Sequence, residues 1–166
     1  MNEAEHLHIL VVLVEDHPGV LQRVAGMFRK RNFNIDSITV GHSEQEGISR
    51  MTITVRGDTQ VLEQVMKQLN KLIEVIKVLE LPRDDTVSRE LALLKIKTKD
   101  EKARAEVVQY ANIFRGRVID VRKDSLIVEI TGDRDKVDAF VKLASMFGIQ
   151  ELAKTGVTAM ARGRLE

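Results

Sequence analysis

The sequence of 166 residues contains no cysteine and no tryptophan, and only 4% of its residues are aromatic. Without cysteine, the chain can form no disulfide, no thiolate nucleophile and no cysteine-based zinc site. A core must therefore consist mostly of Val, Ile, Leu and Met. The hydrophobic content of 43% is ample for such a core and predicts a globular protein of one domain or two small ones.

The chain also lacks an excess of charge of either sign. Lys and Arg total 26, Asp and Glu total 25, and the formal net charge is +1. Neither half is a basic patch by composition, which argues against nucleic-acid binding. The polar, acidic N-terminus has no features of a signal peptide, and no apolar run is long enough to span a bilayer. We therefore expect a cytoplasmic protein.

The most informative stretch lies near the start of the chain. The hydrophobic run 10–14 ends at Glu15-Asp16-His17-Pro18-Gly19, and the amphipathic segment 20–31 follows at once. Pro18 favours a first helical turn, and Gly19 keeps side-chain bulk away from it. Such a strand–turn–helix unit presents free backbone N–H groups and a partial positive charge, which suit a small carboxylate.

A purely structural interpretation of the same turn remains open at this point. Asp16 can serve as a cap or turn residue, Pro18 as a helix starter and Gly19 as a packing residue. Spacing alone does not decide between the structural interpretation and a ligand site.

Hydrophobic periodicity predicts alternating strands and helices in the first half. The stretch 49–56 alternates strictly, as expected for a strand that is buried on one face only. Gly57-Asp58 is expected to end this strand and cap the next helix. The order is βαββαβ, the ferredoxin-like arrangement. The predicted strands are 8–14, 35–43, 49–56 and 73–81, and the predicted helices begin at residues 20 and 58.

The second half repeats this order of predicted strands and helices after the polar segment Pro82-Arg83-Asp84-Asp85. We predict an α+β protein of two tandem ferredoxin-like βαββαβ domains, with domain ranges 1–82 and 83–166. The predicted strands are 91–98, 116–121, 126–131 and 149–153, and the predicted helices are 100–114 and one capped by Asp133.

An antiparallel sheet covered by helices on one side leaves its second face without a partner. Dimerisation through sheet edges or faces is one way to cover it. The alternative is that the polar face of strand 49–56, with Arg50, Thr52, Thr54 and Arg56, is simply solvated.

The sequence offers little sign of catalysis or metal binding. His6 and His8 lie on one side of a strand, but no third ligand stands at a recognisable spacing. Asp84-Asp85 falls in a linker, where exposure to solvent is the simpler interpretation. We therefore expect no catalytic residue and no metal site in this chain.

Several segments resemble the small regulatory subunits of acetohydroxyacid synthase, also called acetolactate synthase. The region 14–21 and the stretch 31–40 (Arg-Asn-Phe-Asn-Ile-Asp-Ser-Ile-Thr-Val) resemble the ACT domain at the start of that family. Residues 49–53 and 68–72 resemble its third strand and second helix. Residues 114–121, Phe-Arg-Gly-Arg-Val-Ile-Asp-Val, resemble the signature of its C-terminal domain, and 155–163 its C-terminal tail.

The resemblance implies a non-catalytic regulatory subunit. Its partner would be a catalytic large subunit that uses thiamine diphosphate, magnesium and FAD in valine, leucine and isoleucine synthesis. The small subunit would activate that partner and confer feedback inhibition by a branched-chain amino acid, with valine as the first expectation. The chain itself would bind none of those cofactors.

The resemblance also implies where the effector binds. ACT domains of this family pair side by side into a homodimer, and the effector lies at the pair interface. One protomer would contribute Asp16, His17, Pro18, Gly19, Val20 and Leu21, and the other would contribute Asn34 and Ile35. The Gly19 and Val20 N–H groups would face the ligand carboxylate. Some members have Asn in place of Asp16, so this chain departs from them in the polarity of the site.

Three other functions fit the sequence less well. A free-standing amino-acid sensor, for example of transcription, needs a DNA-binding element, and no basic helix-turn-helix is evident. An RNA-binding domain of the same topology needs aromatic residues on its central strands, and 10–14 and 50–56 contain none. A small enzyme on this scaffold lacks a recognisable catalytic cluster.

Overall fold

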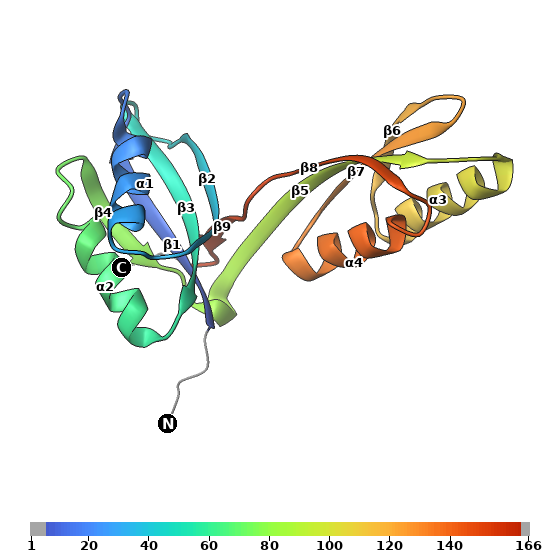
Figure 1. Ribbon diagram of the computed structural model, residues 1–166. Coiled ribbons are helices and arrows are strands. Elements are labelled where there is room, and N and C mark those ends of the chain that lie inside the picture. Colours follow the sequence, from blue (N-terminus) through green and yellow to red (C-terminus); the bar gives the residue numbers. More distant parts are fainter. Residues whose placement is uncertain (1–5, 164–166) are drawn as a thin grey trace. The chain divides into compact units, whose positions relative to one another are not determined.

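The computed structural model describes residues 6–163 and contains two compact units (Figure 1). The first unit comprises the chain up to Val87 and again from Val157 onward, and the second comprises Ser88–Gly156. The chain therefore leaves the first unit once and returns to it. This division differs from the predicted ranges 1–82 and 83–166, which placed the whole C-terminal half in one domain.

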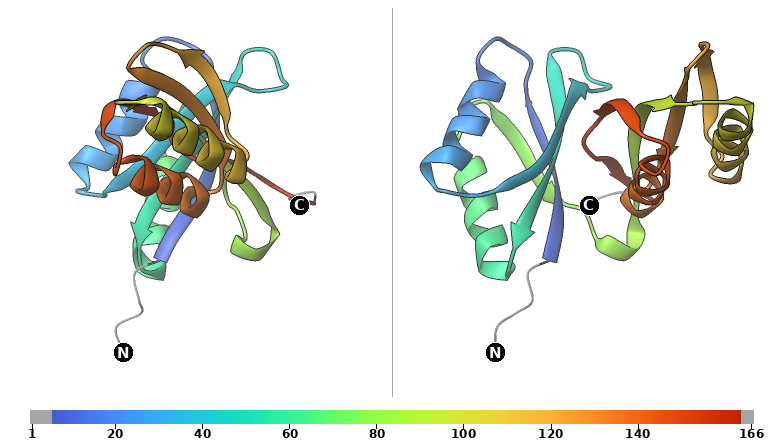
Figure 2. Two further views of the ribbon diagram at one scale, coloured as in Figure 1. Left: turned by 90° about the vertical axis from the view of Figure 1, so that its right-hand side faces the viewer. Right: turned by 45° about the vertical axis from the view of Figure 1, so that its right-hand side comes forward.

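The first unit has the predicted βαββαβ order. Its four strands form one antiparallel sheet in the order β2-β3-β1-β4, and both helices cover the same face of that sheet (Figures 1 and 2). This is the ferredoxin-like arrangement. The elements are β1 (His6–Glu15), α1 (Val20–Lys30), β2 (Ile35–His42), β3 (Ile48–Gly57), α2 (Thr59–Leu69) and β4 (Val75–Glu80).

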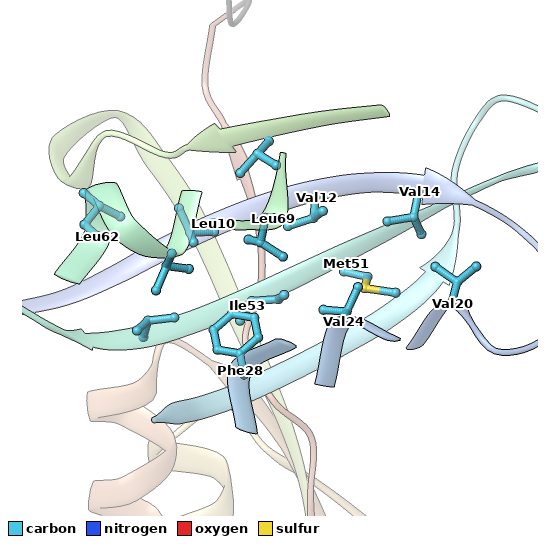
Figure 3. Close-up of a cluster of buried hydrophobic side chains, with 13 residues drawn as sticks. Leu10, Val12, Val14, Val20, Val24, Phe28, Met51, Ile53, Leu62 and Leu69 are labelled. Carbon is cyan, nitrogen blue, oxygen red and sulfur yellow. The ribbon is translucent and has the colours of Figure 1, made fainter. Parts of the chain in front are cut away.

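The main core of this unit lies between the sheet and the two helices (Figure 3). Alternate residues of β1 point into it, and α1 contributes side chains three to four residues apart, as an amphipathic helix does. Phe28 is almost fully buried, and its ring meets the edge of Phe33 at a centroid distance of 6.3 Å. Truncating Phe28 to Ala would cost about 3–5 kcal/mol by the usual scale for buried aromatics.

The opposite face of the first sheet is covered by the chain's own C-terminal segment. Val157 and Ala159 form a second small core with Val11 and Leu81. The alternative of a solvated polar face on β3 is wrong for Thr52 and Thr54, whose exposed fractions are 3% and 0%, although Arg56 on the same face is exposed. β1 is therefore buried on both faces, which explains why residues 10–14 are apolar without alternation.

Hydrogen bonds fix this segment to the sheet. The Val157 N–H donates to Ser37 Oγ at 3.2 Å, and Ser37 Oγ lies 2.7 Å from Thr54 Oγ1. The segment then forms β9 (Thr158–Ala161), which pairs with β5 and was not predicted from the sequence. A segment of only four residues, Thr-Ala-Met-Ala, is too short for its hydrophobic pattern to indicate a strand.

The second unit repeats the topology of the first. Its strands have the order β6-β7-β5-β8, which corresponds position by position to β2-β3-β1-β4. The prediction of two tandem ferredoxin-like folds is thereby confirmed. The elements are β5 (Thr86–Lys97), α3 (Glu101–Ile113), β6 (Arg117–Val121), β7 (Ser125–Gly132), α4 (Arg134–Ala144) and β8 (Ile149–Lys154), preceded by a 3₁₀ turn at Arg83–Asp85.

Aspartates cap three of the four helices, two of them as predicted. The side chains of Asp58, Asp100 and Asp133 each accept a hydrogen bond from the backbone N–H three residues later, at 2.8–2.9 Å. Such a cap satisfies an N–H group that has no partner inside the helix. The exception is α1, whose first turn has no side-chain cap among the described residues.

Candidate functional site

The uncapped start of α1 is the centre of the candidate site. Gly19 occupies the N-cap position with φ +92° and ψ −12°, in the left-handed region that favours glycine. Its carbonyl accepts the N–H of Arg23 at 3.0 Å, which closes the first turn. A Cβ added to Gly19 would meet nothing within 4 Å, so the glycine serves backbone conformation and not close packing. The packing interpretation of Gly19 is therefore wrong for the protomer.

The first turn of α1 leaves two N–H groups without an acceptor in the helix, whereas the Val20 N–H donates to the His17 carbonyl at 3.5 Å. The Leu21 and Gln22 N–H groups lie where a helix offers no internal acceptor. No acidic side chain stands in this turn, so the positive end of the helix dipole is not offset locally. The neighbouring residues 16–19 are exposed, while the Val20 side chain anchors the turn in the core. The geometry suits a carboxylate, which can accept hydrogen bonds from two N–H groups at once.

The acidic residue of the turn is held away from the helix start. Asp16 caps nothing; its carboxylate lies 2.9 Å from Nδ1 of His42, at the end of β2, and its N–H donates to Gly47. His17 lies 3.2 Å from the Glu15 carboxylate. The sequence gives no sign of the contact between Asp16 and His42, because helix α1 and strand β2 lie between the two residues along the chain.

The structure does not bring Asn34 and Ile35 to this turn within one protomer. Ile35 and His8 both lie opposite Val55 on β3, whereas Glu15 lies opposite Ile48. Along β1, the position of Ile35 is therefore seven residues away from Glu15, which precedes the turn. This is a distance of roughly 23 Å at the usual strand rise. Asn34 is exposed, so a site that combines it with Gly19 would need a second copy of the chain.

Exposed apolar side chains lie beside the turn and on the free strand edge. β2 is an edge strand, and its Val40 is 42% exposed on the helix-covered face, where it lies opposite Met51. Leu21, in the first turn of α1, is 47% exposed. An unpaired edge flanked by apolar side chains is a suitable surface for strand pairing with another chain.

The histidines considered as metal ligands have other partners or lie apart. His8 contacts the Glu80 carboxylate at 2.9 Å and the Gly57 carbonyl at 3.2 Å. Within residues 6–163, no three His, Asp or Glu side chains lie close enough together to hold a metal ion. No helix in that range is long and apolar enough to cross a membrane.

Two family models match the chain, one to each half. A model of the ACT domain of acetohydroxyacid synthase small subunits matches residues 10–77, and a model described as the small subunit of acetolactate synthase matches residues 89–163. The first match contains the turn at the start of α1.

Relatives in other organisms are similar over nearly the whole chain. A probable acetolactate synthase small subunit of Methanothermobacter thermautotrophicus is 60% identical, covering 94% of this chain and 93% of the relative. The acetolactate synthase small subunit of Mycolicibacterium smegmatis is 47% identical, with coverages of 98% and 95%. The crystal structure of the small subunit from Thermotoga maritima superposes with a TM-score of 0.90 at 44% identity, covering 96% of this chain and 99% of that one.

Proposed function

The chain belongs to the acetolactate synthase small subunits, and from this premise we propose that it regulates a separate catalytic subunit. It raises the activity of that subunit and makes it sensitive to feedback inhibition by a branched-chain amino acid, with valine as the first candidate. We assign acetolactate formation, and the thiamine diphosphate, magnesium and FAD that it needs, to the catalytic partner.

The single observation that carries the effector site is the uncapped N-terminus of α1. The other three helices are capped by aspartate, whereas this one begins at a glycine in the left-handed region. An effector carboxylate would complete the first turn of α1 as an aspartate side chain completes the others. Its apolar side chain would contact Leu21 and apolar groups of a second protomer.

We propose that the effector site is completed by a second copy of the chain. Two protomers would pair along β2 and form a continuous sheet, which covers Val40 and the free strand edge. Asn34 and Ile35 of the second copy would then approach residues 16–21 of the first. Such a site responds to effector and to dimerisation together, because neither protomer holds all of it.

The contact between Asp16 and His42 bears on how an acidic residue is tolerated beside a carboxylate ligand. His42 lies 2.9 Å from the Asp16 carboxylate and, when protonated, partly neutralises it. The remaining negative charge would favour the effector's ammonium group. In this proposal Asp16 recognises the ammonium group and the helix start recognises the carboxylate.

The decisive experiment combines the chain with its catalytic subunit. Acetolactate formation by the purified catalytic subunit should rise when the chain is added, and valine should reverse the rise. The chain alone should form no acetolactate and bind no thiamine diphosphate. A catalytic subunit that neither binds nor responds to this chain, with or without valine, would exclude the proposed function.

A further inference from the structure

A basic groove lies between α1 and α2, and none of residues 16–21 lines it. It has a volume of about 290 Å³. Met27 and Leu72 provide apolar surface in it, and four cationic side chains contribute to its lining. The lining residues are Arg23, Gly26, Met27, Lys30, Arg31, Gln68, Lys71 and Leu72.

Three of the four cations have no counterion. Arg23 is paired with the buried Glu74 carboxylate at 2.9 Å. No carboxylate in the described part of the chain lies within ion-pair distance of Lys30, Arg31 or Lys71. Cations near the C-terminus of a helix stabilise the helix through its dipole. That role does not explain why cations from α1 and from the segment after α2 line one groove together with apolar side chains. The uncompensated charge attracts an anionic group.

The Gln68 side chain adds a neutral donor and acceptor to the groove. The residue as a whole is 9% exposed and its side chain makes no hydrogen bond to any described residue, but its amide atoms remain accessible from the groove. An amide can donate to a carboxylate and accept from a backbone N–H, so a peptide segment satisfies both of its atoms.

The glycine in the middle of α1 also has no explanation within the protomer. Glycine weakens a helix interior relative to alanine. A Cβ at Gly26 would meet nothing within 4 Å, so no neighbouring group of this chain requires its absence. A helix glycine that faces an open groove permits another chain to approach the helix backbone closely.

From these observations we infer that the α1–α2 groove docks an acidic segment of the catalytic subunit. The segment presents a carboxylate to Lys30, Arg31 and Lys71, and an apolar side chain to Met27 and Leu72. It passes over Gly26 and hydrogen-bonds Gln68. This inference rests on the proposed function, because the partner is the catalytic subunit, but it assigns docking to a surface separate from residues 16–21.

The test compares two charge-reversed double variants of the full chain. Lys30→Glu with Lys71→Glu alters the groove. Arg29→Glu with Lys67→Glu makes the same change of net charge in the last turns of α1 and α2, one residue before Lys30 and four before Lys71, at positions that do not line the groove. Affinity for the purified catalytic subunit is measured by calorimetry at low and moderate salt. Circular dichroism and light scattering verify that both variants are folded and have the wild-type oligomeric state.

The groove variant should bind the catalytic subunit about 30- to 100-fold more weakly, as expected for lost and reversed interfacial charges. It should also lose most of the salt dependence of binding, whereas the control variant stays within about threefold of wild type. Equal affinity of the two variants would overturn the docking site and leave the proposed function intact. Absence of binding by wild type would instead overturn the proposed function.

Gly26 provides an independent measurement. Gly26→Ala should raise the Tm of the isolated chain by about 2–6 °C, because it removes a helix-weakening residue from open space. Gly26→Gln should keep the fold but reduce affinity for the catalytic subunit at least about tenfold, because the side chain fills the approach path. Pyrophosphate binding that Lys30→Glu with Lys71→Glu abolishes, together with unchanged affinity for the catalytic subunit, would identify a small-anion site and contradict docking.

Discussion

The Arg50 guanidinium donates a hydrogen bond of 2.9 Å to the carbonyl oxygen of Ala159, 109 residues later in the chain. This bond joins β3 to β9 on the face of the first sheet that carries no helix. Beside it, Val157 and Ala159 cover Val11. The first unit is therefore completed only after the second has been synthesised.

A fragment of residues 1–87 should consequently be less stable than a fragment that also contains the C-terminal segment 157–166. Without Val157 and Ala159 it exposes Val11 and Leu81 and should aggregate or bind a hydrophobic dye. Joining Val87 to residues 157–166 through a short Gly/Ser linker should restore a cooperative unfolding transition. Urea unfolding of the two fragments measures the difference. Equal stability would mean that the C-terminal segment contributes nothing to the first unit.

Gly19→Asp should abolish feedback inhibition while the protein still activates its partner. The new carboxylate would repel the effector carboxylate and occupy the helix start, which should raise the half-inhibitory valine concentration about 30- to 1,000-fold, equivalent to about 2–4 kcal/mol. Gly19→Asn is the matched control, since it has the same shape without charge and tolerates φ +92° comparably.

Both Gly19 variants should lose about 1 kcal/mol of stability from the left-handed backbone. Titration of the reconstituted enzyme with valine distinguishes them. An unchanged half-inhibitory concentration in a folded, activating Gly19→Asp protein would remove this turn from the effector site.

Val40→Asp should convert a dimer into a monomer. Val40 lies on the free edge strand β2, where an inserted charge opposes strand pairing. Ile76→Asp is the control, because Ile76 is 53% exposed on β4, the strand at the other edge of the same sheet. Light scattering at micromolar concentration gives the masses. If both variants remain dimeric, pairing does not use β2.

Lys154→Met should destabilise the second unit more than Lys95→Met. Lys154 lies 2.8 Å from Glu90, a carboxylate whose side chain is 2% exposed, and removing Lys154 leaves that charge with Arg134 as its ion-pair partner among residues 6–163. We expect a loss of about 1–3 kcal/mol. Lys95 lies equally close to Glu151, but that pair is solvated and its loss should be too small to measure.

The stability that Lys154 contributes should depend on pH. Burial works to lower the pKa of Lys154, but the carboxylates of Asp138 and Glu90 outweigh burial and raise the pKa above its ordinary value of 10.5. A raised folded-state pKa gives stability that is complete below the unfolded pKa and is lost as pH rises through the folded one. The stability difference between wild type and Lys154→Met should therefore shrink above about pH 10.5. A difference that is constant from pH 7 to beyond 11 would contradict this assignment.

Local patterns in the sequence determined most of each ferredoxin-like unit. The caps at Asp58 and Asp133 depend on contacts three residues apart, and helix periodicity depends on side chains three or four apart. Strand 49–56 was placed within one residue at each end. The turn at Pro18-Gly19 was recognisable for the same reason, since its conformation is set by those two residues.

Only the tertiary structure decided what covers the first sheet and what surrounds the turn. The contact of Val11 with Val157 spans 146 residues, and the contact of Asp16 with His42 spans helix α1 and strand β2. Closing such distances depends on the whole topology, and a short segment such as Thr158–Ala161 carries no local preference that reveals its partner. The sequence by itself therefore determined the helices, the strands other than β9 and the turn at Pro18-Gly19, because these depend on neighbours along the chain. The fold alone decided that the last strand returns to complete the first unit, because packing across the sheet joins residues that the sequence keeps apart.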